Sequence, residues 1–113
     1  MTMLTGAHVM IFSADPDADR AFLRDMLEIP CIDSGGGWLI FRLPPAELGV
    51  HGGDNGFHQI YLMCDDAEGF ARQMAGKSVE TLPITDEDWG RSTGVKLPGG
   101  GTLGIYEPRH ARP

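Results

Sequence analysis

AHVMIF at residues 7–12 is repeated 50 residues later as FHQIYL at residues 57–62. A second pair follows in the same order, because LGVHGG at 48–53 is repeated as LGIYEP at 103–108. Each stretch has the apolar character of a strand, so one pair opens and the other closes each half of the chain. A repeat at a nearly constant spacing marks duplicated structural units. The sequence therefore predicts two halves of one design, with ligand chemistry where the halves face each other.

The segments between these strands give each half the order β-α-β-β-β. Asp15-Pro16 begins the first helix, since aspartate caps free N–H groups and proline suits the first helical position, and we expect Pro30 to end it. An aspartate at 65 or 66 caps the second helix in the same way, and we expect that helix over about 67–75. The predicted strands are 7–13, 31–33, 38–43 and 46–51 in the first half, and 57–64, 79–85, 94–97 and 102–107 in the second, with an acidic loop at 86–88 and a turn at 98–101.

Length and composition limit the class of protein. The 113 residues suit one domain at 1–113, with module one at 5–52, module two at 56–108 and a tail at 109–113. A net charge of −7 argues against nucleic acid as a partner, because phosphates need a basic surface. No apolar run approaches the ~18 residues of a membrane span. The isolated Cys31 and Cys64 predict reduced thiols, which are typical of a cytoplasmic protein.

This order of elements resembles the vicinal oxygen chelate superfamily, which includes glyoxalase I, bleomycin and fosfomycin resistance proteins and extradiol dioxygenases. The resemblance extends from Ala7 to Pro108. It implies an α+β fold in which two tandem βαβββ modules form a curved mixed-sheet cup, completed in a homodimer, with a site in the concave mouth. It is carried by His8, the Asp15-Pro16 helix start with Phe22 and Leu27, Trp89-Gly90, and the LPGGGTL turn at 97–103.

Metal-dependent members of this superfamily hold a divalent ion on four strands, with histidine and glutamate or glutamine ligands. Carried over to this chain, the opening-strand ligands are His8 and His58, and the closing-strand positions are Gly49 and Gly104. Because glycine has no donor side chain, the resemblance implies that the set is incomplete and that no metal is bound.

Two residues could still complete the set. Glu107 points away from the face of Gly104 unless a bulge or a one-residue shift turns it inward. His51 shares the face of Gly49, because side chains alternate along a strand. With His8 and His58, either would form a site for Fe, Ni, Mn or Zn.

Three functions follow from these alternatives. The first is a protein that binds a small amphipathic or aromatic molecule in the cup without a complete metal site. The second is a metal-dependent lyase or dioxygenase that acts on a vicinal-oxygen substrate through His8 and His58, and the third is a dimeric regulatory or scaffolding module. Whether the chain is an enzyme stays open. The candidate ligand-binding residues are His8, Phe12, Trp38, Phe41, His51, His58, Tyr61, Trp89 and Tyr106.

Overall fold

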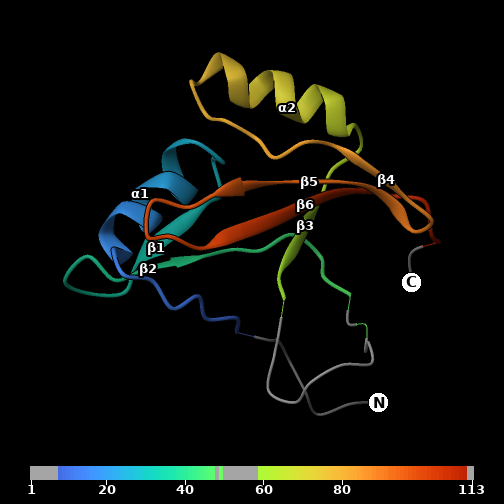
Figure 1. The fold of residues 1–113 in the computed structure, drawn as a ribbon. Coiled ribbons are helices and arrows are strands. Elements are labelled where there is room, and N and C mark those ends of the chain that lie inside the picture. The colour runs from blue at the N-terminus through green and yellow to red at the C-terminus, as the bar shows by residue number, and fades with distance from the viewer. Residues whose placement is uncertain (1–7, 48, 50–58, 112–113) are drawn as a thin grey trace, which may run out of the picture.

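A computed structural model of the chain describes residues 8–47, 49 and 59–111, which contain two helices and six strands (Figure 1). Strands β1 and β2 form an antiparallel hairpin. The other four form a mixed sheet in the order β3-β6-β5-β4, in which β3 runs parallel to β6. The predicted α+β class is therefore confirmed. In chain order the elements are α1 (Pro16–Asp25), β1 (Cys31–Asp33), β2 (Leu39–Phe41), β3 (Tyr61–Met63), α2 (Ala67–Gly76), β4 (Thr85–Glu87), β5 (Gly90–Lys96) and β6 (Thr102–Pro108).

Both helices begin at the predicted aspartates. The side chain of Asp15 accepts the N–H of Ala18 at 3.2 Å, and that of Asp66 accepts the N–H of Gly69 at 3.1 Å. Each bond satisfies one of the free N–H groups of a first helical turn. Helix α1 ends at Asp25, five residues before Pro30, so the proline does not itself end the helix.

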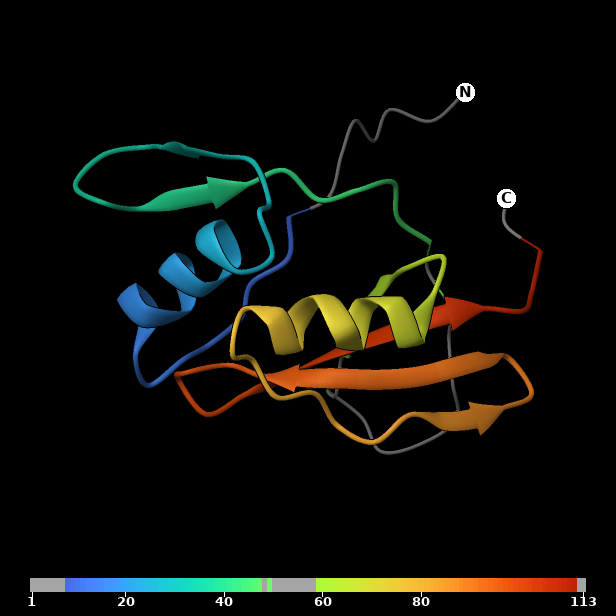
Figure 2. The ribbon, with the colours of Figure 1, turned by 90° about the horizontal axis from the view of Figure 1, so that it is seen from above.

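Helix α2 covers one face of the four-stranded sheet (Figures 1 and 2). Beneath it lie the buried side chains of Val95, Leu103 and Ile105, with Met74 from the helix. Side chains alternate along a strand, so the neighbours of Leu103 and Ile105 in β6, namely Gly104 and Tyr106, belong to the opposite face. We call this opposite face, which α2 does not cover, the open face.

The strand pattern of the second half differs from the prediction at three places. The predicted strand at 79–85 is wrong except for its last residue, Thr85, which begins β4, and Thr81 makes only an isolated bridge to Val95. Strand β5 begins at Gly90 rather than at 94, and β4 includes Asp86 and Glu87, which were predicted as loop. A short turn at 88–89 joins the two strands and pairs Glu87 with Gly90. β4 is an edge strand, where charged side chains are favoured because they discourage further pairing. The acidic residues therefore suit a strand that the hydrophobic pattern does not reveal.

The predicted strands at 7–13 and 46–51 are wrong for their described parts. Residues 8–13, and residues 46, 47 and 49, belong to no strand. Val9, Met10, Ile11 and Phe12 are all exposed, and Phe12 is 91% exposed. A strand needs a neighbouring strand for its backbone hydrogen bonds, and within the described part of this single chain residues 8–13 have none.

One buried carboxylate joins the two halves. Asp19 in α1 is only 5% exposed, and its Oδ1 accepts the N–H of Gly99 in the 98–101 turn at 2.7 Å. Its Oδ2 is buried without a hydrogen-bond partner. Across the same junction, the N–H of Ala14 donates to the carbonyl of Gly99 at 3.4 Å. The start of α1 is thereby fixed to the turn between β5 and β6.

Neither helix of the described ranges is long and apolar enough to cross a membrane. Cys31 and Cys64 form no disulfide.

Candidate functional site on the open face

A groove of about 390 Å³ lies against the open face of the sheet. Its lining comes from residues 10–12, residues 59–61, and residues 101–104 with Leu97. Most of these side chains are apolar, and this is the composition that small-molecule sites share. The groove thus lies where the opening segment of one half meets the opening and closing strands of the other.

Three aromatic side chains meet beside this groove. The rings of Tyr61, Trp89 and Tyr106 contact one another edge to face, with centroids 5.2–5.9 Å apart. Such contacts are favourable because the positive edge of one ring meets the negative face of the next. Tyr61 and Trp89 remain 39% and 41% exposed, so the group that we call the aromatic cluster presents ring surface to the outside.

The strand register explains how residues so distant in the sequence meet. Tyr61 pairs with Gly104 across β3 and β6, and Tyr106 follows two residues later on the same face. Trp89 enters from the turn between β4 and β5, where its carbonyl accepts the N–H of Arg109 at 2.9 Å. Glycine is required after Trp89, because a Cβ at Gly90 would overlap the carbonyl oxygen of Glu107.

Gly104 provides the space in which the Tyr61 ring lies. A Cβ atom at position 104 would stand 2.9 Å from Cγ of Tyr61 and closer still to Cδ1. Any side chain here would displace the ring. The glycine that removes a predicted metal-ligand position therefore has a packing role in the cluster.

His110 is a polar member of the site that the sequence reasoning missed. Its Nε2 lies 2.9 Å from the hydroxyl of Tyr106, and its Nδ1 lies 3.0 Å from the carbonyl oxygen of Ala111. A carbonyl only accepts, so in the neutral ring Nδ1 carries the hydrogen and Nε2 accepts from Tyr106. The sequence places His110 in the tail at 109–113, and no pattern in that tail signals the contact.

The other candidate residues lie at different places in the structure. Phe12 lines the groove. His8 is exposed and is not among the described lining residues. Trp38 and Phe41 belong to the region of the β1–β2 hairpin, and the Arg20 guanidinium lies 4.7 Å from the centre of the Trp38 ring. The candidates His51 and His58 lie outside the described residues.

The described residues do not fit a metal ion on this face. Glu107 faces the other side of the sheet, where its Oε1 accepts the N–H of Ala67 at 3.0 Å in the first turn of α2. The position of Gly104 offers no donor, and the Tyr61 ring fills the space beside it. Among residues 8–47, 49 and 59–111, no three histidine, cysteine or acidic side chains gather closely enough to hold a metal.

Comparison with known proteins identifies the type of fold. No protein-family model matches the chain. No curated protein matches it in sequence. Solved structures do match over most of its length. Lactoylglutathione lyase from Agrobacterium tumefaciens has a TM-score of 0.62 at 15% identity, with 89% of this chain and 93% of that chain covered.

Two further structures agree. The antibiotic binding protein TnmS3 from Streptomyces sp. CB03234 has a TM-score of 0.58 at 16% identity and covers 93% of this chain and 98% of its own. The fosfomycin resistance protein FosX from Listeria monocytogenes has a TM-score of 0.59 at 16% identity, with 92% and 93% covered. The predicted resemblance is confirmed at the level of structure. The chain has the fold of the vicinal oxygen chelate superfamily, to which glyoxalases and the bleomycin and fosfomycin resistance proteins belong.

Proposed function

We propose that this chain binds a small, largely apolar or aromatic molecule in the open-face groove. The observation that carries the proposal is the contact between the groove and the aromatic cluster, since Tyr61 belongs to both. A volume of about 390 Å³ lies within the range of ~300–1,000 Å³ that is typical of ligand pockets. An aromatic ligand would continue the edge-to-face contacts that Tyr61 and Trp89 already make.

The polar groups of the site suit a ligand with one hydrogen-bonding function. The Tyr106 hydroxyl and the His110 ring form a hydrogen-bonded pair at the margin of the cluster. A ligand hydroxyl in that place would donate to the Tyr106 oxygen, because a hydroxyl oxygen accepts as well as donates. The likeness to an antibiotic binding protein gives this reading further support, as analogy rather than as evidence of a shared ligand.

A homodimer is part of the same proposal. The exposed apolar run Val9–Phe12 lies along the groove, and a second copy that paired with this run would cover both. Burial of such a run is favourable by roughly 25 cal/mol per Å² of apolar surface. We expect the dimer to form in the cytoplasm, where Cys31 and Cys64 stay reduced. Size-exclusion chromatography with light scattering tests the dimer, and a monomer at micromolar concentration would contradict it.

The test of binding uses 2-naphthol as a neutral aromatic probe and thermal unfolding as the readout. A ligand at 100 times its dissociation constant adds about 2.7 kcal/mol of stability. We expect the wild type to gain stability and Tyr61→Ala to lose most of this gain. Trp38→Ala is the matched control, because Trp38 is an exposed aromatic residue outside the groove lining. An equal gain in Tyr61→Ala and the wild type would contradict the proposal.

The metal-dependent lyase or dioxygenase is tested by elemental analysis of the purified protein. Near-stoichiometric Fe, Ni, Mn or Zn that is lost in a His8→Ala, His58→Ala double variant would overturn the metal-free reading. Retention of 2-naphthol binding by that double variant is the result that the groove proposal expects.

A further inference from the structure

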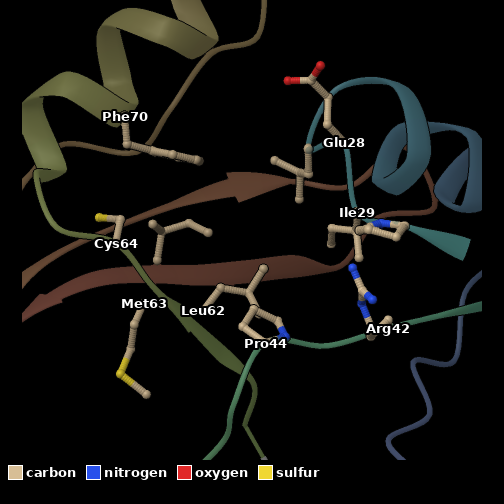
Figure 3. A pocket seen from close by; sticks show the side chains of 11 residues that line it. Glu28, Ile29, Arg42, Pro44, Leu62, Met63, Cys64 and Phe70 are labelled. Carbon is tan, nitrogen blue, oxygen red and sulfur yellow. The ribbon is translucent and has the colours of Figure 1, made fainter. Parts of the chain in front are cut away.

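A second cavity, of about 270 Å³, lies on the other side of the sheet from the groove. Figure 3 shows it between the end of α1, helix α2 and the segment that follows β2. Leu62 and Ile105, which pair across β3 and β6, line it from the face that α2 covers. This cavity is therefore separate from the site of the proposed function.

The interior of this cavity is apolar. Leu27, Ile29, Pro44 and Phe70 complete its lining with Leu62 and Ile105. Cys64 also contributes, and burial raises the pKa of its thiol, so the group is neutral at pH 7 and adds no charge. An apolar ligand body would replace water here at a gain in free energy.

Arg42 is the cation among the described residues that line this cavity. The backbone N–H of Arg42 donates to the carbonyl of Pro30 at 2.9 Å, which fixes the residue beside the end of α1. Its side chain extends from the segment that follows β2 toward Ile29 (Figure 3). Glu28 also lines the cavity, but its carboxylate bonds to Lys77 Nζ at 3.1 Å and points away from the interior.

Arg42 differs from the other arginines of the described residues, because each of those has an acidic partner and Arg42 has none. Its charge is therefore not neutralised within the described part of the chain, although the protein has a net charge of −7. The paired arginines are Arg20 with Asp17, Arg24 with Asp25, Arg72 with Asp66, Arg91 with Glu68 and Arg109 with Asp86.

We propose that this cavity binds a small monocarboxylate with an apolar body, whose carboxylate pairs with Arg42 and whose body contacts Leu62 and Phe70. A planar guanidinium matches a carboxylate with two parallel hydrogen bonds. A single guanidinium balances one negative charge, so a dianionic phosphate would keep an unpaired charge near apolar surface. At about 30 Å³ for each water-sized group, the volume holds roughly nine such groups. This is close to the ten non-hydrogen atoms of an acid with eight carbons.

The experiment is a titration of the isotope-labelled protein with octanoate, followed by NMR, with octan-1-ol as the uncharged analogue. We expect octanoate to shift the amide resonances around Leu62, Phe70 and Ile105, and to bind about tenfold more tightly than octan-1-ol. Arg42→Gln should reduce the octanoate affinity about tenfold, to the level of the alcohol. Arg42→Lys should retain part of the preference, because it keeps the charge and loses the paired geometry.

Arg72→Gln is the matched control, since Arg72 is an exposed arginine outside the cavity lining, and it should bind octanoate as the wild type does. Equal affinity for octanoate and octan-1-ol in the wild type would overturn the proposal, and so would an Arg42→Gln variant with unchanged affinity. Octanoate shifts at Phe12, Tyr61 and Gly104 would assign the acid to the open-face groove instead. Resonances of the cavity that shift on dilution without ligand would show that a second copy covers it, which also overturns the proposal.

Discussion

Replacing Gly104 by alanine places a methyl group where the Tyr61 ring lies. The new Cβ would stand 2.9 Å from Cγ of Tyr61, an atom next to the backbone that a small rotation of the ring cannot move away. Tyr61 would have to change its χ1 angle and leave its contacts with Trp89 and Tyr106. Overpacking costs about 1–3 kcal/mol, and each aromatic pair contributes about 0.5–1.5 kcal/mol.

Two effects reduce the combined cost of the overpacking and the lost aromatic contacts. Tyr61 is 39% exposed, so its ring can swing partly into solvent, and a glycine-to-alanine change stabilises by ~0.4–1 kcal/mol through the unfolded state. We therefore expect Gly104→Ala to lower the free energy of unfolding by about 2 kcal/mol, measured by urea denaturation. In a Tyr61→Ala background the same change should cost less than about 0.5 kcal/mol, because the obstructing ring is gone.

Gly76→Ala is the matched control. No atom lies within 4 Å of the Cβ that it would add at the end of α2, so we expect no loss of stability. Equal losses from Gly104→Ala in the wild-type and Tyr61→Ala backgrounds would refute the reasoning, since they would show that the methyl group and the ring do not compete for space.

Three further changes test other parts of the structure. Glu107→Ala should lower the free energy of unfolding in urea by about 1–2 kcal/mol, because the first turn of α2 loses its acceptor; a loss of bound metal in this variant would contradict the placement of the carboxylate. Asp19→Ala should cost about 1–3 kcal/mol in the same assay by leaving the Gly99 N–H unpaired, and Asp19→Asn should cost less because its amide oxygen still accepts. In a Cys31→Ser variant, the rate at which Cys64 reacts with a disulfide reagent should increase with pH. The midpoint of this increase should lie above the ordinary pKa of a thiol, since burial raises the pKa of Cys64. The folded state then holds the proton more tightly than the unfolded state, so stability should fall as the pH rises from the unfolded pKa through the folded one, and a midpoint below the ordinary value would contradict this.

Local chemistry made the helices predictable. Asp15 and Asp66 cap the helices that begin beside them, and this needs only a side chain and the next three residues. The hairpin over 98–101 is also local, because its glycines and proline favour a turn. Alternation along β6 correctly placed Glu107 opposite Gly104 once the strand itself was identified.

The remaining features depend on contacts between distant residues, which a pattern along the chain does not contain. Val9–Phe12 has the composition of a strand, but the described residues offer it no pairing partner. Trp89 was a candidate, but its contact with Tyr61 requires the registers of three strand pairs at once. His110 follows the last strand, and nothing in its neighbours signals that its ring reaches the Tyr106 hydroxyl.

The bond between Asp19 and Gly99 spans 80 positions of the chain. A contact of that span closes a large loop. Closing the loop costs conformational entropy, and this cost comes before the hydrogen bond contributes any stabilising free energy. The hairpin of β5 and β6 can form early from neighbouring residues, but its turn reaches its final hydrogen bonds only after α1 has docked. The chain should consequently fold slowly for its length and melt in one transition, with the two repeats losing their structure together.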